Sequence, residues 1–140
     1  MGDARRSLGA TGEAIALRGL EHSGARLLAR NARVSGVRGE LDLVVLEDGE
    51  IIFVEVKTRS GTAVRRREAG RGSVGLPGPE TPAGAVGPRK QAKIRSLACA
   101  WLREHRDELP PNRGIRFDVV GLRLSPSGEV LEGERLKGAF

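Results

Sequence analysis

The chain has 140 residues, a formal net charge of +6, a pI near 10.6 and a single cysteine. This length suffices for one domain with a single core, and one cysteine excludes an internal disulfide. No stretch reaches the roughly 20 apolar residues that span a bilayer, and the start lacks the apolar region of a signal peptide, so we expect a cytoplasmic protein with no membrane partner. The positive charge favours a polyanionic partner such as nucleic acid, although arginine-rich chains also arise from biased genome composition.

The first predicted element is a helix over residues 10–22, ending near Gly24, where glycine adopts the left-handed cap. Glu13, Leu17 and Leu20 follow the i, i+4, i+7 spacing of one helical stripe. An acid on a stripe that faces the core is unusual and makes Glu13 a candidate site residue. The alternative is a surface acid that complements the helix dipole. A first strand is predicted over residues 26–33.

Residues 39–59 are predicted to form a β-hairpin, because Asp48 and Gly49 lie between two apolar runs. A symmetric turn centred on this pair joins residues whose numbers sum to 97. It therefore places Asp42 opposite Glu55. By the two-residue period of a strand, one face of the hairpin carries Leu41, Leu43, Val45, Ile52, Val54 and Val56, and the other carries Glu40, Asp42, Val44, Phe53, Glu55 and Lys57.

The facing acids Asp42 and Glu55 are the main chemical signal of this hairpin. Two carboxylates about 5 Å apart repel by roughly 3 kcal/mol at an effective dielectric of about 20. A divalent cation would offset this repulsion, and Mg²⁺ is typically held by one or two carboxylates. The alternative is a solvated strand end whose acids are neutralised by Lys57 and nearby arginines. Lys57 is notable because the chain has twenty arginines and four lysines. A partly buried ammonium can orient or deprotonate a water molecule.

Residues 61–87 are rich in Gly, Pro and Arg and are predicted to be a flexible insertion, either a phosphate-contacting arm or a disordered loop. A helix over residues 88–108 follows, with an apolar stripe that includes Trp101 as a core anchor and Cys99 as a buried thiol. Lys90 and Lys93 lie in its first turns and are either phosphate contacts or a solvated face. Strands are predicted over residues 115–124, where Asp118 is given a structural role, and over residues 129–136.

Asp42 followed by Glu55-Val56-Lys57 on the next strand resembles the metal-binding core of the PD-(D/E)xK nuclease superfamily. Across nearly the whole chain outside residues 61–83, the order of motifs resembles the small bacterial YraN family, related by fold to archaeal Holliday-junction resolvases. The segments that carry this resemblance are Gly12-Glu13, Arg30-Asn31, Gly39-Glu40-Leu41-Asp42-Leu43, Phe53-Val54-Glu55-Val56-Lys57-Thr58-Arg59, Lys90-Gln91, Arg116-Phe117-Asp118-Val119-Val120 and Ala139-Phe140.

The resemblance implies one restriction-endonuclease-like domain over residues 1–140, an α/β fold with a mixed central sheet of about five strands flanked by helices. It implies a metal-dependent endonuclease in which Asp42, Glu55 and Glu13 hold Mg²⁺, with Mn²⁺ as an alternative ion, and Lys57 positions the attacking water. DNA contacts are expected from Lys90, Lys93, Arg59 and Arg38.

With 3% aromatic residues and no tyrosine, duplex or branched DNA is a better expected partner than single strands. A homodimer is expected by analogy with junction resolvases. The alternative function is a nucleic-acid-binding protein that keeps the scaffold without catalysis.

Overall fold

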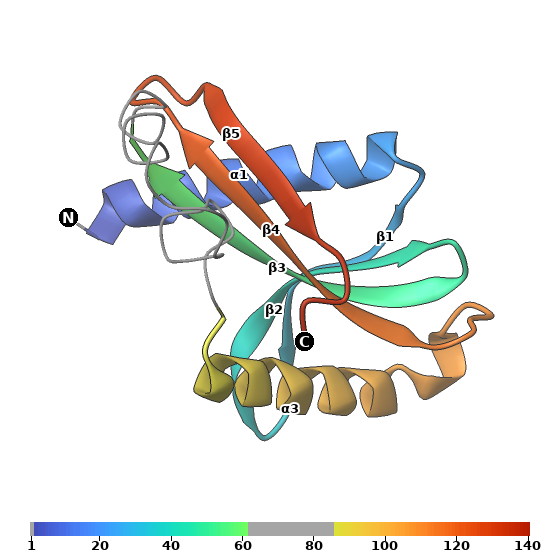
Figure 1. Ribbon diagram of the computed structural model, residues 1–140. Helices are drawn as coiled ribbons and strands as arrows, with labels where there is room; N and C mark the ends of the chain where they lie inside the picture. Colours follow the sequence, from blue (N-terminus) through green and yellow to red (C-terminus); the bar gives the residue numbers. More distant parts are fainter. Residues whose placement is uncertain (1, 62–85) are drawn as a thin grey trace.

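A computed structural model describes residues 2–61 and 86–140 (Figure 1). Five strands form one mixed sheet in the order β1-β2-β3-β4-β5, in which β3 and β4 are parallel and the other neighbours are antiparallel. The elements are α1 (Gly2–His22), β1 (Arg26–Val34), β2 (Val37–Glu47), β3 (Glu50–Ser60), α3 (Pro88–Glu104), a 3₁₀ turn η1 (Arg106–Glu108), β4 (Ile115–Leu124) and β5 (Val130–Leu136). The predicted α/β architecture with a five-stranded mixed sheet is confirmed. Most of the predicted insertion at 61–87 lies outside the described residues.

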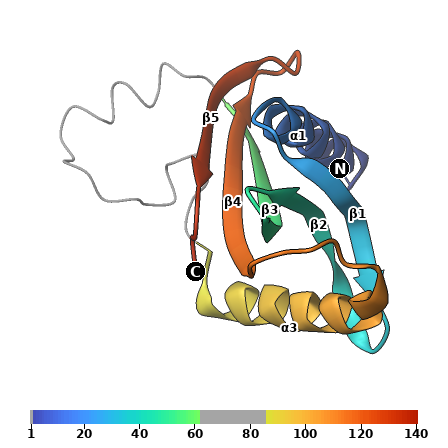
Figure 2. The ribbon, with the colours of Figure 1, turned by 90° about the vertical axis from the view of Figure 1, so that its right-hand side faces the viewer.

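The two long helices cover different parts of the sheet (Figure 2). α1 packs chiefly on β3, while α3 packs on β2 and β1. The sheet therefore supports two apolar clusters. The α1 cluster contains Ala16, Leu20, Ala25, Leu43, Val45, Ile52, Val54, Val120, Leu122 and Leu124; the α3 cluster contains Val34, Leu41, Val44, Ile51, Phe53, Ile94, Leu97, Ala98, Ala100, Trp101 and Phe117. Neither described helix is long and apolar enough to cross a membrane.

Several predicted boundaries were wrong. α1 begins at Gly2 rather than near residue 10. Asp3 lies in its first turn, where an acidic side chain complements the helix dipole and favours the earlier start. α3 ends at Glu104 rather than residue 108. There the His105 ring stacks on Trp101 with centroids 4.4 Å apart, and the chain tightens into η1 before Pro110. β1 and β5 differ from their predicted ranges by a single residue.

The hairpin register is confirmed. Asp48 (φ 51°) and Gly49 (φ 78°) both adopt the left-handed conformation that a two-residue type I′ turn requires. The observed pairs run from Glu47 with Glu50 to Leu43 with Val54, and every pair sums to 97. The face predicted for Leu41 was wrong, since this side chain belongs to the α3 cluster. β2 has left β3 by this point, so alternation along the hairpin no longer decides which face it occupies.

Two predictions for α3 had opposite outcomes. Trp101 is a core anchor as predicted: it is buried and meets the Phe53 ring edge-on with centroids 5.9 Å apart. Cys99 was predicted to be buried but is exposed. The buried residues of α3 are Ile94, Leu97, Ala98, Ala100 and Trp101, and position 99 projects outward between two of them.

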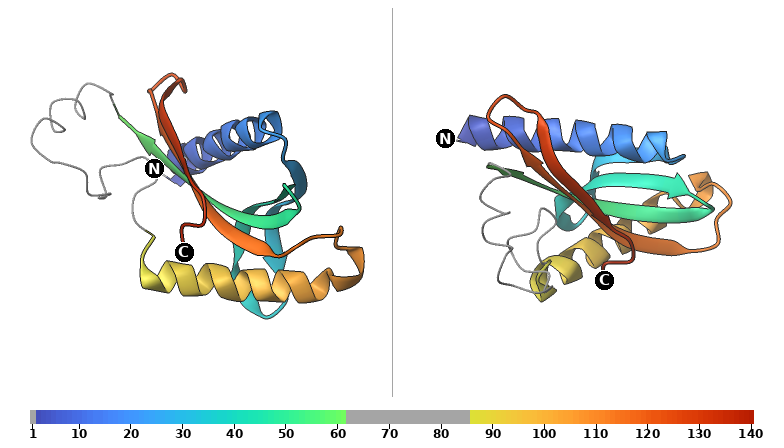
Figure 3. Two further views of the ribbon diagram at one scale, coloured as in Figure 1. Left: turned by 45° about the vertical axis from the view of Figure 1, so that its right-hand side comes forward. Right: turned by 45° about the horizontal axis from the view of Figure 1, so that its top comes forward.

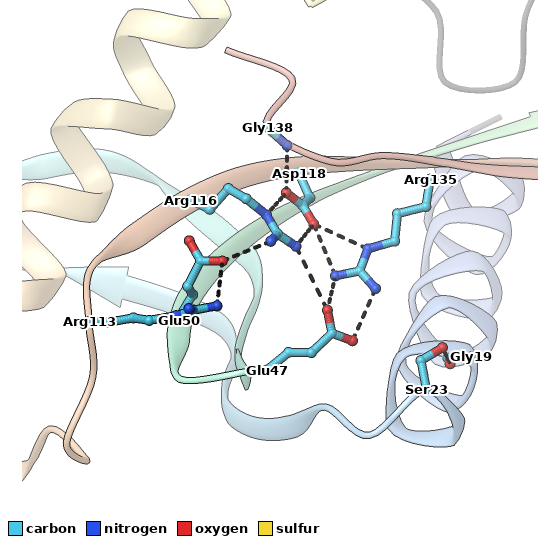
Figure 4. Close-up of polar contacts among 9 residues, drawn as sticks. All are labelled: Gly19, Ser23, Glu47, Glu50, Arg113, Arg116, Asp118, Arg135 and Gly138. Carbon is cyan, nitrogen blue, oxygen red and sulfur yellow. Dashed lines mark hydrogen bonds and ion pairs between the residues drawn. The ribbon is translucent and has the colours of Figure 1, made fainter.

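Asp118 lies in a buried polar network at the turn end of the hairpin, which we call the hairpin-end network: Glu47, Glu50, Arg116, Asp118 and Arg135 (Figure 4). Asp118 is fully buried. Its carboxylate accepts hydrogen bonds from the guanidinium groups of Arg116 at 2.8 and 2.9 Å and Arg135 at 3.0 and 3.1 Å, and from the Gly138 N–H at 3.0 Å. These contacts join β4, β5 and the residues after β5, which agrees with the structural role predicted for Asp118.

Candidate active site

The candidate site lies where β2 separates from β3. The pairing of these strands stops at Leu43 and Val54, after which β2 bends toward α3 while β3 continues beside β4 (Figure 3). Beyond this fork the Val56 N–H donates instead to Asp42 Oδ2, at 2.8 Å. An N–H and C=O of one strand residue point to the same side of the strand. The Val56 carbonyl therefore also points into the fork.

The fork opens into a cleft of about 640 Å³, which we call the fork cleft. Glu13 enters it from α1, Asp42 from β2 and Glu55 from β3. The complete lining is Leu8, Gly9, Glu13, Asp42, Glu55, Val56, Thr58, Arg59 and Ser60. Three predicted catalytic residues, far apart in the sequence, thus share one cleft.

Asp42 and Glu55, the carboxylate pair, are electrostatically strained. The Glu55 side chain is only 13% exposed, and burial followed by the negative charge of Asp42 raises its pKa to about 7. Burial also raises the pKa of Asp42, against the opposing effect of the Val56 N–H. Burial and the mutual repulsion of the two carboxylates both oppose a second negative charge at this position, and a proton shared between them would relieve it. The pair therefore binds either a proton or a cation.

Glu13 extends this acidic site. Its pKa is raised by burial first and by the charge of Asp42 second, which places the two carboxylates in mutual range. Arg30 and a hydrogen bond from Asn31 act in the opposite direction. Sequence reasoning did not assign Asn31 a site role. The available signal was weak: asparagine tolerates the left-handed backbone better than most residues, but nothing in the pattern of the first strand called for that conformation.

The predicted basic residues fall into two groups. Lys90 lies at the carboxylate pair, with its Nζ 3.3 Å from Glu55 Oε1. Lys57 does not line the fork cleft; burial and the charge of Arg59 lower its pKa, and the opposing effect of Glu55 shows that the two are in electrostatic range. Arg59 lines the fork cleft. Lys93 lies close to Gly39 and Arg38 is exposed at the start of β2, and neither of them lines the fork cleft. The ion pair between Lys90 and Glu55 was not foreseen, since it depends on how α3 docks.

The donor set suits a hard divalent cation. Asp42 and Glu55 supply carboxylate oxygens, and the Val56 carbonyl points into the same fork. Mg²⁺ commonly keeps several waters and takes only one or two protein carboxylates. Within residues 2–61 and 86–140, no three His, Cys, Asp or Glu side chains converge closely enough to hold a metal together.

Gly12 determines how closely α1 approaches β3. A Cβ atom built on Gly12 would lie 1.9 Å from Thr58 Oγ1 and 2.9 Å from Thr58 Cβ, so only glycine fits there. Thr58 Oγ1 is buried and has no hydrogen-bond partner among the described residues. The contact brings the next helical residue, Glu13, into the fork cleft.

We expect Gly12→Ala to destabilise the fold by roughly 1–3 kcal/mol, because α1 must move off β3 to relieve the overlap. The matched control is Gly19→Ala in the same helix, where an added Cβ meets nothing within 4 Å. That change should instead stabilise by about 0.5–1 kcal/mol through helix propensity. Urea unfolding followed by circular dichroism measures both; a neutral or stabilising Gly12→Ala would contradict the close contact.

A second prediction concerns the carboxylate pair. In the folded state Glu55 has a pKa of about 7, above its ordinary value of 4.5, so its ionisation costs stability as pH rises through this interval and the full cost is present above pH 7. Glu55→Gln should therefore stabilise the metal-free protein at pH 8 by roughly 2 kcal/mol, with a gain that shrinks toward pH 5. The lost ion pair with Lys90 subtracts little, since that lysine is half exposed.

The control for Glu55→Gln is Glu40→Gln, which removes an acid paired with Arg33 at the surface. Its free energy of unfolding should stay within about 0.5 kcal/mol of the original protein at both pH values. Urea titrations at pH 5 and pH 8 in the presence of a chelator make the comparison. If Glu55→Gln were no more stable than the original protein at pH 8, the carboxylate pair would not be electrostatically strained.

Comparison with known proteins identifies the family. The model of the uncharacterised protein family UPF0102 matches residues 12–122. A UPF0102 protein of Frankia alni is 43% identical over 137 residues, covering 98% of this chain and 97% of the relative. One of Streptomyces griseus is 36% identical over 126 residues, covering 90% of both.

Among solved structures, SfsA of Pyrococcus furiosus in complex with Ca²⁺ matches with a TM-score of 0.37 and 20% identity over 91% of this chain and 62% of SfsA, so this chain spans about three fifths of its length. Similarity at that level is not evidence for a shared fold or ligand. The family match and the full-length relatives are decisive: the chain belongs to UPF0102, the YraN family that its motifs resemble.

Proposed function

We propose that this protein is a metal-dependent endonuclease that hydrolyses DNA phosphodiester bonds, with branched or junction DNA as a candidate substrate. The observation that carries the proposal is the carboxylate pair: two partly buried acids at the strand fork whose second negative charge needs a proton or a cation beside it, with Lys57 in electrostatic range of Glu55. A pair that costs stability in its ionised form is retained most readily where it has chemistry to perform.

In this mechanism Asp42 and Glu55 would hold Mg²⁺, with the Val56 carbonyl as a further oxygen donor. The hydrogen bond from the Val56 N–H fixes Asp42 at the fork, and Glu55 would act as a ligand in its ionised form. The ion would supply Lewis-acid stabilisation of the phosphate and a more acidic bound water. Lys57, whose pKa is lowered, orients the attacking water, and Glu13 would contribute to the metal site directly or through water.

DNA binding is proposed for the basic residues around the fork cleft. Arg59 lines the cleft, whereas Arg38 at the start of β2 and Lys93, which lies close to Gly39, are outside its lining and would contact DNA further along the backbone. Lys90 contacts Glu55 in the metal-free protein. With a cation bound beside Glu55, the attraction between Glu55 and Lys90 would be weaker, and the Lys90 ammonium would be available to pair with a substrate phosphate. Such contacts read the DNA backbone rather than its sequence.

The alternative, a DNA-binding protein without catalysis, is favoured by one observation. The Lys90 ammonium lies 3.3 Å from Glu55 Oε1 and could itself neutralise the carboxylate pair, with no need for a metal. In that case salt-sensitive DNA binding would be unchanged by Asp42→Asn, and no divalent ion would yield product.

The test is a cleavage assay on linear, flapped and four-way-junction DNA with purified protein, with and without Mg²⁺ or Mn²⁺, beside calorimetric titration with each ion alone. Metal binding and metal-dependent product support the nuclease. Salt-sensitive DNA binding with neither metal binding nor product supports the alternative. The same panel of substrates measures any preference for branched DNA, and the oligomeric state of the active species tests the expected homodimer.

A further inference from the structure

Asn31 has an unusual backbone for its place in the fold. Among the described residues only Asn31 (φ 49°) and Asp48 (φ 51°) combine a positive φ with a side chain. Asp48 lies in the hairpin turn, which demands that conformation. Asn31 instead lies inside β1, a strand of nine residues. A left-handed residue within a strand costs energy, least for Asn or Asp, and such strain persists mainly where the surrounding structure or function requires it.

The position of Asn31 places it at the candidate site. In the pairing of β1 with β2, Arg30 lies opposite Leu43 and Ala32 opposite Leu41, so Asn31 lies opposite Asp42. The Asn31 side chain lies within reach of Glu13, whose pKa it lowers by acting as a hydrogen-bond donor, and Glu13 lines the fork cleft from α1. One residue thus links the helix that carries Glu13 to the strand pair that carries Asp42. This link is not needed to close the core, since Asn31 is exposed and belongs to neither apolar cluster.

We propose that Asn31 is a positioning residue of the active site, whose amide orients the Glu13 carboxylate toward the carboxylate pair. The inference rests on the proposed function, because its consequence is tighter metal binding and faster cleavage. The Glu13 carboxylate needs such a partner, because Glu13 reaches the cleft from α1 whereas Asp42 and Glu55 reach it from the sheet. Groups that orient the ligands of a metal site typically contribute about 10–100-fold to metal affinity or activity.

The test separates the amide from the backbone conformation. Asn31→Gly keeps the left-handed backbone, which glycine adopts freely, but removes the amide. The matched control is Asp48→Gly, which makes the same exchange at the other left-handed residue, outside the cleft lining. Both variants are compared with Glu13→Gln and with the double variant that combines Glu13→Gln and Asn31→Gly. For each protein we measure the Mn²⁺ affinity by calorimetry, kcat and KM on DNA, and the urea midpoint.

We expect Asn31→Gly to weaken Mn²⁺ binding and to lower kcat by about 10-fold or more, with the urea midpoint and KM close to those of the original protein. Asp48→Gly should leave affinity and kcat unchanged. In the Glu13→Gln background, Asn31→Gly should have little further effect, because the two residues act as one unit.

Full Mn²⁺ affinity and kcat in Asn31→Gly would overturn the inference while leaving the nuclease proposal intact. The inference would also fail if the losses in the double variant equalled the sum of the losses in Asn31→Gly and Glu13→Gln. An original protein that binds no metal and cleaves no DNA would overturn the proposed function, and this inference with it.

Discussion

Asp42→Asn is expected to abolish metal-dependent DNA cleavage, with a loss of at least 10²–10⁴-fold in kcat, while DNA affinity stays within about threefold. The substitution keeps the shape of the side chain, and its amide oxygen can still accept the hydrogen bond from the Val56 N–H. It removes the negative charge that a cation needs. Folding is therefore preserved while metal binding is lost, and calorimetry with Mn²⁺ should show no binding.

Lys57 provides an independent arm of the same prediction. Lys57→Ala should lower kcat by a similar factor, whereas Mn²⁺ affinity should fall little, because Lys57 acts on water rather than on the ion. Lys57→Arg keeps the positive charge but cannot give up a proton near neutral pH, and its planar group differs in geometry. Activity of Lys57→Arg near that of the original protein would show that only the charge is required.

The control for both positions is Glu40→Gln, which removes an exposed acid on β2 two residues from Asp42. Cleavage should stay within about twofold, since Glu40 pairs with Arg33 and does not line the fork cleft. If Asp42→Asn cleaved DNA as fast as Glu40→Gln does, the carboxylate pair would not be the catalytic centre, and the nuclease proposal would fail.

The local part of the site was predictable from the sequence, and the reason is turn chemistry. Asp48 and Gly49 tolerate the left-handed backbone, so they fix both the turn and the register, and the register brings Asp42 and Glu55 together. Both the turn and the strand register depend only on residues close to Asp48 and Gly49 in the sequence. Glu13 could be proposed from a helical stripe and a family resemblance, but the stripe alone could not say which strand it faces.

The parts that failed depend on contacts between distant segments. Leu41 was assigned to the wrong face because alternation assumes that β2 stays beside β3, and the fork ends that pairing. The ion pair between Lys90 and Glu55 depends on the docking of α3. Asn31 was missed because a left-handed residue inside a strand has no local signature. Asp118 was correctly judged structural, yet its partner Arg135 was not foreseeable, since Arg135 lies on a different strand.

Asp118→Ala is expected to destabilise the fold by about 3–5 kcal/mol at pH 7, a large share of the 5–15 kcal/mol typical of a domain. The substitution leaves Arg116 and Arg135 half-buried without the carboxylate that both share. Glu47 and Glu50 remain as partners of the two arginines, but the Gly138 N–H loses its acceptor. Guanidinium unfolding followed by fluorescence of Trp101 measures the loss.

The pH dependence of stability separates this network from ordinary packing. Burial alone would raise the pKa of Asp118, but hydrogen bonds from Arg116, Gly138 and Arg135 outweigh it and lower that pKa below 3.8; the pKa of Glu47 is lowered chiefly by Arg135. A lowered folded-state pKa contributes stability that is present above the ordinary pKa and lost as pH falls below it. The original protein should therefore lose stability between about pH 4.5 and pH 2, and Asp118→Ala should show a shallower loss there.

Glu40→Gln, which breaks an ion pair whose arginine side chain is 80% exposed, should change stability by less than about 1 kcal/mol. Glu47→Gln supplies an intermediate case. It removes the ion pair between Glu47 and Arg135, while Asp118 still pairs with both arginines. The expected order of destabilisation is Asp118→Ala, Glu47→Gln, Glu40→Gln. If Asp118→Ala cost no more than Glu40→Gln, the hairpin-end network would not hold β4, β5 and the chain end together, and Asp118 would need another role.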